Sequence, residues 1–164
     1  MNRVAQSGIV NLDPEDFYPK FEIQELDIKP WLFQGLLLKE KDFRASLAEH
    51  DWLAYKGKHV CVYCSSDAII PQWAYMLIAT YLQPVDCEFQ KGTKEEFIHQ
   101  YMSEAIRNVD YSTFADARVI IKGCGQHPIP DFVYLELTKR LMPVTKSVMF
   151  GEACSTVPIY KKKK

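Results

Sequence analysis

Long hydrophobic runs and an excess of either charge are missing from this 164-residue sequence. Its longest apolar stretch, from Ala74 to Leu82, is far shorter than the roughly 20 residues that a helix needs to cross a bilayer. Residues 1–10 lack the charged and apolar regions of a signal peptide, so we expect a cytoplasmic protein that does not bind membranes. With 20 basic and 21 acidic residues the formal net charge is -1, which argues against nucleic acid as a partner.

Several catalytic and phosphate-binding motifs are also missing. The sequence contains no Gly-x-x-x-x-Gly-Lys-Ser/Thr loop, no Gly-x-Gly-x-x-Gly fingerprint, no His-Glu-x-x-His helix and no Gly-x-Ser-x-Gly elbow. Nucleotide binding and classical hydrolysis therefore have no support. Internal repeats and Gly/Ser-rich linkers are absent too, so the sequence predicts one domain over residues 1–164.

The pattern of apolar residues divides this predicted domain into three parts. Residues 1–57 are irregular and β-rich, with extended segments near 8–12, 21–28 and 31–38. A covering helix is expected over 40–50, because Phe43 and Leu47 share one of its faces. Residues 58–160 alternate regularly between strand-like and helical segments. Residues 161–164 form a lysine run that we expect to be a frayed tail.

The regular part predicts an α/β fold, three-layer-like, with one mostly parallel or mixed sheet. The expected strands are 59–63, 85–89, 118–122 and 147–150, followed by an edge strand over 157–160 that contains Pro158. The first helix begins near Pro71 and is apolar almost all round, so we expect it to be deeply buried. Thr93 and Glu96 form a capping box for the second helix, and prolines bound the third, over 131–141.

Three of the five cysteines follow strands of this predicted sheet. Cys64, Cys124 and Cys154 each lie in a loop after a strand, and ligands of open α/β sheets bind beyond the carboxyl ends of strands. Three thiols converging there, with Asp67 or His127 as a further ligand, would suit zinc, iron or an iron–sulfur cluster. The cysteine positions therefore predict a metal site without selecting the metal.

Each of these residues also has a structural interpretation. Free cysteine is among the most buried residue types, so the three thiols could fill the core separately. Asp67 could instead cap the helix that follows it. His127 and Glu152 are candidate proton-transfer groups, and a surface histidine is the alternative for His127.

The other two cysteines and the tryptophans are expected to be structural. Cys61 and Cys64 have Cys-x-x-Cys spacing, but Cys61 falls inside a strand and not at a helix start, so core packing is the better interpretation. Cys87 has the same interpretation. Trp31, Trp52 and Trp73 are expected to pack in the core.

Several segments resemble an uncharacterised bacterial family, a domain of unknown function. The resemblance spans nearly the whole chain and is carried by residues 8–13, 39–44, 64–71, 73–76, 135–138 and 151–158. It implies no activity, substrate or residue role. It does imply that genes of the family lie near those of the sulphur-mobilisation system of iron–sulfur cluster assembly, and therefore favours cysteines that handle metal, sulfide or a cluster.

Three functions remain open at this point. The first is a cysteine-lined metal or iron–sulfur site in an accessory protein of cluster assembly, with assembly proteins as partners. The second is a thiol-dependent enzyme or persulfide carrier that uses His127 or Glu152 as a base. The third is a non-catalytic interaction module with structural cysteines. The apolar and aromatic content is also compatible with a homodimer.

Overall fold

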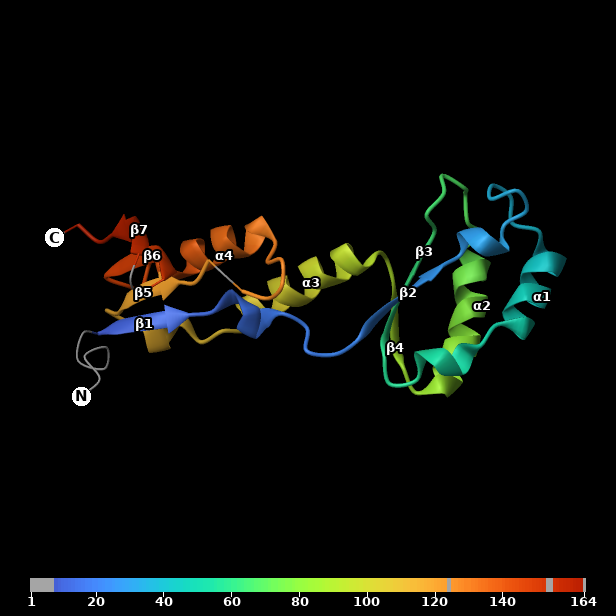
Figure 1. Ribbon diagram of the computed structural model, residues 1–164, viewed down its shortest axis with the longest axis horizontal. Coiled ribbons are helices and arrows are strands. Elements are labelled where there is room, and N and C mark those ends of the chain that lie inside the picture. Colours follow the sequence, from blue (N-terminus) through green and yellow to red (C-terminus); the bar gives the residue numbers. More distant parts are fainter. Residues whose placement is uncertain (1–7, 124, 153–154, 164) are drawn as a thin grey trace. The chain divides into compact units, whose positions relative to one another are not determined.

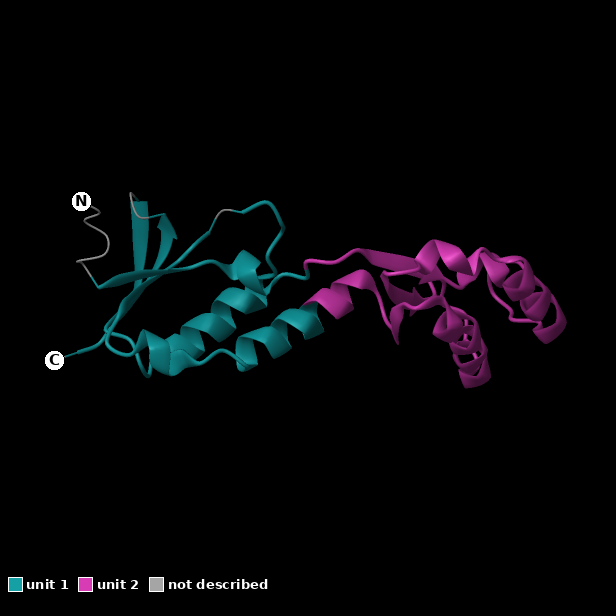
Figure 2. Ribbon diagram, turned by 90° about the horizontal axis from the view of Figure 1, so that it is seen from below, with its two compact units in different colours: residues 1–19, 99–164 teal, residues 20–98 magenta. Residues whose placement is uncertain are grey.

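The computed structural model describes residues 8–123, 125–152 and 155–163. These residues form an α/β fold with strands in two separate sheets, A and B. The chain divides into two compact units, which are coloured separately in Figure 2. Unit 1 comprises residues 1–19 and 99–164, and unit 2 comprises residues 20–98.

Sheet A belongs to unit 1 and has the strand order β1 (Ile9–Leu12), β5 (Arg118–Ile121), β6 (Ser147–Glu152) and β7 (Ser155–Lys161), as labelled in Figure 1. The first three strands are parallel, with Ile9 opposite Arg118 and Arg118 opposite Ser147. The edge strand β7 runs antiparallel to β6. Sheet A is therefore a parallel sheet with one antiparallel edge.

The helices of unit 1 lie on one side of sheet A (Figure 2). These are α4 (Asp131–Leu141) and the part of α3 (Lys94–Arg107) that belongs to this unit. Valines at the centre of the sheet and apolar residues of the helices form the core on this side: Met102, Ile106, Val119, Val133, Leu137, Leu141 and Val148 are all fully or almost fully buried. Burial of such side chains is the main source of stability for the unit.

Sheet B belongs to unit 2 and consists of β2 (Ile23–Asp27), β3 (His59–Tyr63) and β4 (Glu88–Lys91), all parallel, with β3 in the centre. The helices α1 (Glu40–Glu49) and α2 (Gln72–Leu82) complete this unit. Phe43 and Leu47 of α1 are fully buried with Val60 of β3, as the spacing of the two α1 residues predicts. The three tryptophans pack against this core, which confirms their structural interpretation.

Most predicted elements are present. The helix over 131–141 and the strand over 59–63 have the expected bounds. The capping box is also confirmed, because Glu96 N–H donates to Thr93 Oγ1 and Thr93 N–H donates to Glu96 Oε2. Local signals such as caps and apolar spacing thus located these elements.

Other expectations were wrong. The strand expected over 85–89 begins later, since β4 starts at Glu88. The chain before it is not extended, because Gln83–Val85 form a 3-10 turn and Asp86 has a positive φ of 60°. Residues 31–38 form no strand beyond an isolated bridge from Phe33 to Leu37. α2 is not buried all round, since Met76 is 69% exposed.

The strands also pair differently from expectation. Residues 59–63 lie in sheet B, whereas 118–121 and 147–152 lie in sheet A, so the strands preceding Cys64, Cys124 and Cys154 do not share one sheet. Alternation identifies strands and helices, but pairing depends on contacts between distant residues. Here each sheet takes a strand from the irregular N-terminal part: β1 for sheet A and β2 for sheet B. The prediction of a single domain stays a prediction.

The expectation of a frayed tail over residues 161–164 was wrong for its first two residues, because Lys161 belongs to β7 and Lys162 is hydrogen-bonded to the chain just before β6. Lys161 still pairs with Ser147, and Lys162 N–H donates to the carbonyl of Lys146 at 2.9 Å. No helix within the described residues has the length and apolar character that crossing a membrane requires.

Candidate functional site

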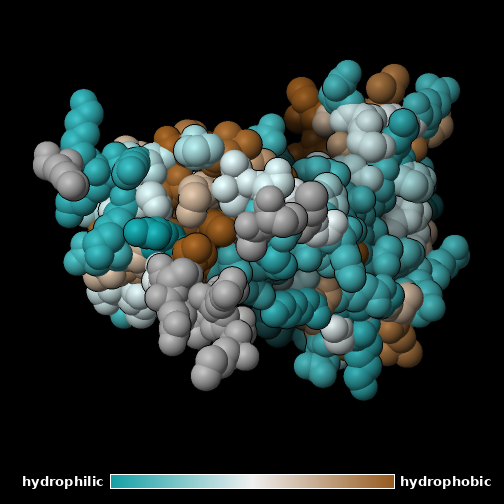
Figure 3. Space-filling view, turned by 60° about the vertical axis from the view of Figure 1, so that its left-hand side comes forward, coloured by the Kyte–Doolittle hydropathy of each residue, from teal (hydrophilic) through white to brown (hydrophobic). Residues whose placement is uncertain are grey.

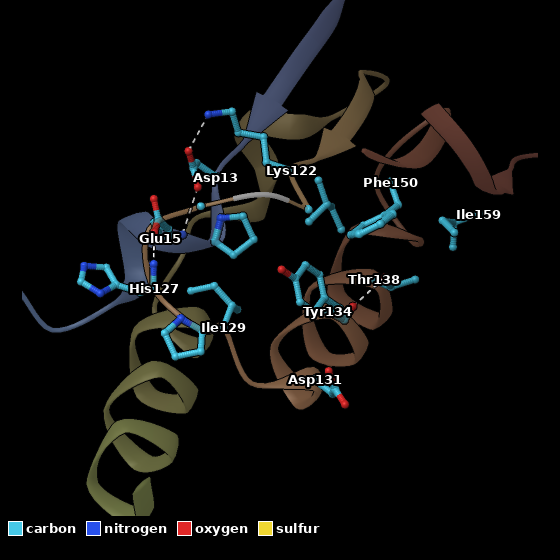
Figure 4. Close-up of a pocket in the computed structure, with 15 residues that line it drawn as sticks. Asp13, Glu15, Lys122, His127, Ile129, Asp131, Tyr134, Thr138, Phe150 and Ile159 are labelled. Carbon is cyan, nitrogen blue, oxygen red and sulfur yellow. Dashed lines mark hydrogen bonds and ion pairs between the residues drawn. The ribbon is translucent and has the colours of Figure 1, made fainter. Parts of the chain in front are cut away.

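A cavity of about 720 Å³ lies at the carboxyl end of sheet A, beyond the last residues of β1 and β5. It is lined by the turn after β1, the loop after β5, one face of α4, and strands β6 and β7 (Figure 4). Loops at this end of an α/β sheet vary freely above a rigid scaffold, and ligands of such folds bind there. A cavity therefore lies at the end of sheet A where a ligand site is expected in such a fold.

An ion pair forms one wall of the cavity. Lys122 Nζ, just after β5, donates to Asp13 Oδ2 of the turn after β1 at 2.8 Å. Asp13 also accepts from the Glu15 N–H at 3.1 Å, because it caps the 3-10 turn Pro14–Phe17. The hydrogen bond from Lys122 lowers the pKa of Asp13, although partial burial opposes this effect. The same bond raises the pKa of Lys122, so both groups stay charged around neutral pH.

Glu15 holds the loop that follows β5. Its Oε1 accepts from the backbone N–H groups of Gln126 at 2.5 Å and His127 at 2.6 Å. Gly125 leaves room for this carboxylate, since a Cβ on Gly125 would lie 2.5 Å from Glu15 Cδ. A carboxylate that accepts from two consecutive amides fixes a loop strongly, because charge-assisted bonds are about twice as strong as neutral ones.

The opposite wall is aromatic and apolar. Phe150 of β6 meets Tyr134 of α4 edge to face, with ring centroids 5.6 Å apart, and Figure 4 shows the two rings turned toward each other. Gly123 makes space for Phe150, because a Cβ on Gly123 would overlap the Phe150 ring at Cζ. Ile129 and Ile159 extend the apolar lining. The cavity thus combines a charged wall with an apolar wall, as small-molecule sites commonly do.

The predicted ligands and bases occupy different parts of the chain. Cys124 and Cys154 lie outside the described residues. His127 is exposed at the edge of the cavity, and its ring stacks on that of Tyr18 with the ring centroids 4.2 Å apart. Figure 4 shows the His127 ring on the side away from Tyr134 and Phe150. Glu152 ends β6, is half-buried, and its charge contributes to the raised pKa of Lys122. The proposed chemical roles of His127 and Glu152 stay predictions.

Cys64 and Asp67 lie in unit 2, after β3. The Cys64 thiol is half-buried and lies 3.2 Å from Ser66 Oγ. Ser65 next to it donates through its N–H and hydroxyl to the Asp27 carboxylate, at 3.0 and 2.6 Å. Asp67 is exposed and does not cap α2, whose N-cap is Pro71 with no side-chain hydrogen bond. The capping expectation was wrong because the N-cap position of α2 falls at Pro71 and not at Asp67.

The remaining cysteines are structural, as predicted. Cys61 is fully buried in β3, and burial raises the pKa of its thiol to about 11, which leaves it protonated and unreactive around neutral pH. Burial also raises the pKa of Cys87, whose thiol lies 3.6 Å from the Leu82 carbonyl. The raised pKa of Cys61 therefore argues against a redox role for the Cys-x-x-Cys spacing of Cys61 and Cys64.

The described residues alone do not fit a metal. No group of three His, Cys, Asp or Glu side chains in residues 8–123, 125–152 and 155–163 is placed to hold an ion. A metal site would need Cys124 or Cys154. The sequence patterns also did not single out the residues that shape the cavity, Asp13, Glu15, Lys122 and Tyr134. The signal for Asp13 was present, because Asp13-Pro14 marks the turn directly after the first strand.

Comparison with protein-family models gives a match over residues 1–162 to the family described as "Protein of unknown function (DUF2480)". No curated protein and no solved structure matches the chain at a significant level.

Proposed function

The chain belongs to the DUF2480 family, and we propose that this member binds a small ligand in the cavity at the carboxyl end of sheet A. The observation that carries the proposal is the position of a mixed charged and apolar cavity beyond the ends of neighbouring parallel strands. The family resemblance is confirmed by the match, whereas the bacterial origin and the link to cluster assembly stay predictions.

The lining defines the chemical class of the ligand. Phe150, Tyr134 and Ile129 offer apolar and aromatic surface, which favours a ligand with an apolar body. Lys122 and Asp13 form the charged wall, which favours a polar or ionic head group that can exchange hydrogen bonds with the ion pair. We therefore infer a small amphipathic organic molecule.

The test is a set of small aromatic and aliphatic carboxylates and amines, added to protein with labelled isoleucine methyl groups. Binding in the cavity shifts the methyl resonances of Ile121, Ile129 and Ile159, which line it, and leaves Ile28 and Ile78 in the core of unit 2 unchanged. Probes that shift none of the three lining methyl groups contradict the proposal.

A matched pair of variants locates the effect. Ile129→Trp fills the cavity and is expected to abolish the methyl shifts. Leu135→Trp places the same indole on α4 at a position that is 71% exposed, and should leave binding unchanged. Equal loss of the methyl shifts in both variants would indicate a general disturbance of α4 and its neighbourhood, and would contradict the proposal.

A second proposal is a metal ion or iron–sulfur cluster at the same end of the sheet, which would make the protein an accessory of cluster assembly. It is favoured by one observation: Gly123 and Gly125, the chain neighbours of Cys124, both line the cavity, as does His127. Cys61, Cys64 and Cys87 are free thiols, in keeping with the reducing cytoplasm that this proposal assumes.

The test of the second proposal is elemental analysis with an absorption spectrum, on protein purified without oxygen. Near-stoichiometric zinc or iron that is lost in Cys124→Ser and Cys154→Ser supports it. Cys64→Ser and Asp67→Asn determine whether the two predicted ligands of unit 2 take part, because only true ligands reduce the metal content. Metal-free protein from cells supplied with iron and zinc would contradict the proposal.

A further inference from the structure

A second hollow, of about 800 Å³, lies at the opposite end of sheet A, where β1, β5 and β6 begin and β7 ends. We call it the basic groove. Ile9, Met149, Pro158 and Tyr160 form its apolar floor. Successive side chains of a strand point to opposite faces, so Met149 points away from the helix-covered face on which its neighbour Val148 is buried.

The rim of the basic groove is strongly cationic. It consists of Arg118, Lys146 and Lys161–Lys163, all exposed, and Asp116 is the one acid among its described lining residues. None of these five cations forms an ion pair with another described residue. Figure 3 shows hydrophilic side chains projecting beside apolar ones on the face of unit 1 that comes forward in that view. The chain carries a net charge of -1, so this positive charge is a local concentration.

We propose that the basic groove docks an acidic peptide segment of a partner protein. Its carboxylates pair with the cationic rim, and its apolar side chains cover the floor. Cations without internal partners attract an anionic chain over several ångströms and form charge-assisted hydrogen bonds with carboxylates on contact. Charge complementarity therefore specifies the sign of the partner, and the floor specifies its apolar content.

Three other occupants fit less well. Residues 1–7 of the chain, which precede β1, contain Arg3 and no acid, so they do not complement the rim. A nucleic acid would find the cations, but Tyr160 is the only aromatic side chain in the described lining and offers a single surface for base stacking. An inorganic anion has no apolar body to cover Met149 and Ile9. The combination of floor and rim thus favours an acidic and apolar peptide.

The experiment measures binding of a fluorescent peptide that alternates glutamate with leucine, by anisotropy on the full chain. A peptide with glutamine in place of leucine tests the floor, and one with lysine in place of glutamate tests the rim. We expect the first peptide to bind, the second to bind more weakly, and the third not to bind. Raising the salt concentration weakens the first complex, because rim charges are exposed and screened.

A charge-reversal variant locates the site. We replace Arg118, Lys146 and Lys162 by glutamate. This variant is expected to bind the glutamate–leucine peptide at least about tenfold more weakly than the wild type. Because all three side chains are exposed, the variant is expected to unfold at nearly the same temperature as the wild type.

The matched control reverses the exposed Lys20, Lys41 and Lys56 of unit 2, which changes the net charge equally. Equal weakening in the control, equal binding of the glutamine peptide, or tighter binding of a single-stranded oligonucleotide would each overturn the proposal. Sedimentation without peptide adds one more outcome: self-association that the charge-reversal variant abolishes would make a second copy of the chain the occupant, and would also overturn it.

Discussion

The two ends of sheet A differ in whether their charged side chains are paired within the protein. At the carboxyl end Lys122 is paired with Asp13, and Glu15 accepts hydrogen bonds from two backbone amides. At the amino end the cations of the basic groove have no ion-pair partner among the described residues. Internal pairing fixes the shape of the first site before a ligand arrives, whereas unpaired charge leaves the second site dependent on an external partner. Shape should thus select the ligand at one end, and charge should select the partner at the other.

The largest expected difference between the two ends concerns a glycine. Gly151 of β6 has φ of 121°, and a Cβ there would lie 2.5 Å from the backbone oxygen of Ser155. Gly151→Ala therefore combines backbone strain with a clash that no side chain can relieve, and should lower the free energy of unfolding by about 2–3 kcal/mol. Urea titration followed by circular dichroism measures this loss.

Gly8 provides the control at the amino end. Its φ is 63°, but beyond its chain neighbours no atom of the described residues lies within 4 Å of the position that a Cβ would take, so Gly8→Ala should cost only about 1 kcal/mol. Equal losses for the two variants would show that the carboxyl end is no more tightly built than the amino end.

The acids at the two ends should also differ, by a smaller amount. Glu15→Ala leaves the Gln126 and His127 amides without their acceptor, and is expected to cost about 1 kcal/mol, a low value because the site is partly exposed to water. Asp116→Asn at the amino end should be nearly neutral, because asparagine tolerates the positive φ of 57° at this position. Thermal unfolding measures both.

Amide exchange separates a loop effect from a general one. In Glu15→Ala the exchange should accelerate at residues 126 and 127 and stay unchanged in β3 of unit 2. Unchanged exchange at the two loop amides would mean that Glu15 does not hold the loop.

The smallest effect is the pH dependence of the Asp13–Lys122 pair. The pKa of Asp13 is lowered below its ordinary value of 3.8 in the folded protein. The unfolded chain therefore binds the proton first, so the contribution of the pair is complete well above pH 3.8 and is lost as the pH falls through the folded pKa. Asp13→Asn should lower the unfolding temperature by about 1–2 °C at pH 7 and have no effect near pH 2.

Lys146→Gln in the basic groove serves as the comparison, since Lys146 has no acidic partner among the described residues whose protonation could change its contribution. A difference between wild type and Asp13→Asn that persists at pH 2 would show that packing, and not the ion pair, explains the effect.

Local patterns predicted much of the fold. The capping box at Thr93 and the apolar spacing of Phe43 and Leu47 act within a few residues, and each located its helix. The assignment of strands to two sheets depends on pairs such as Val10 with Val119, which are far apart in the chain and leave no local signature. The alternation of strands and helices therefore predicted one sheet for all of the later strands, where the protein has two.

The candidate site was predicted in position but not in composition. The rule that ligands bind at the carboxyl ends of strands located the loop of His127 correctly at the cavity. The cysteine pattern gave no reason to consider Asp13 and Lys122. These two charged residues come together only because β1 pairs with β5. Their partnership could not be read from sequence, since 109 positions separate them.

That separation also affects the order in which the protein is made. Unit 2 is one continuous stretch, residues 20–98, and all of it is synthesised before β5. β1 is synthesised before unit 2 but must wait for β5, the strand with which it pairs, so it remains an unpaired hydrogen-bonding edge while unit 2 is made. Synthesis of unit 2 is thus complete before that of unit 1, and a truncated chain that ends before residue 118 would contain all of unit 2 together with an N-terminal strand that has no partner.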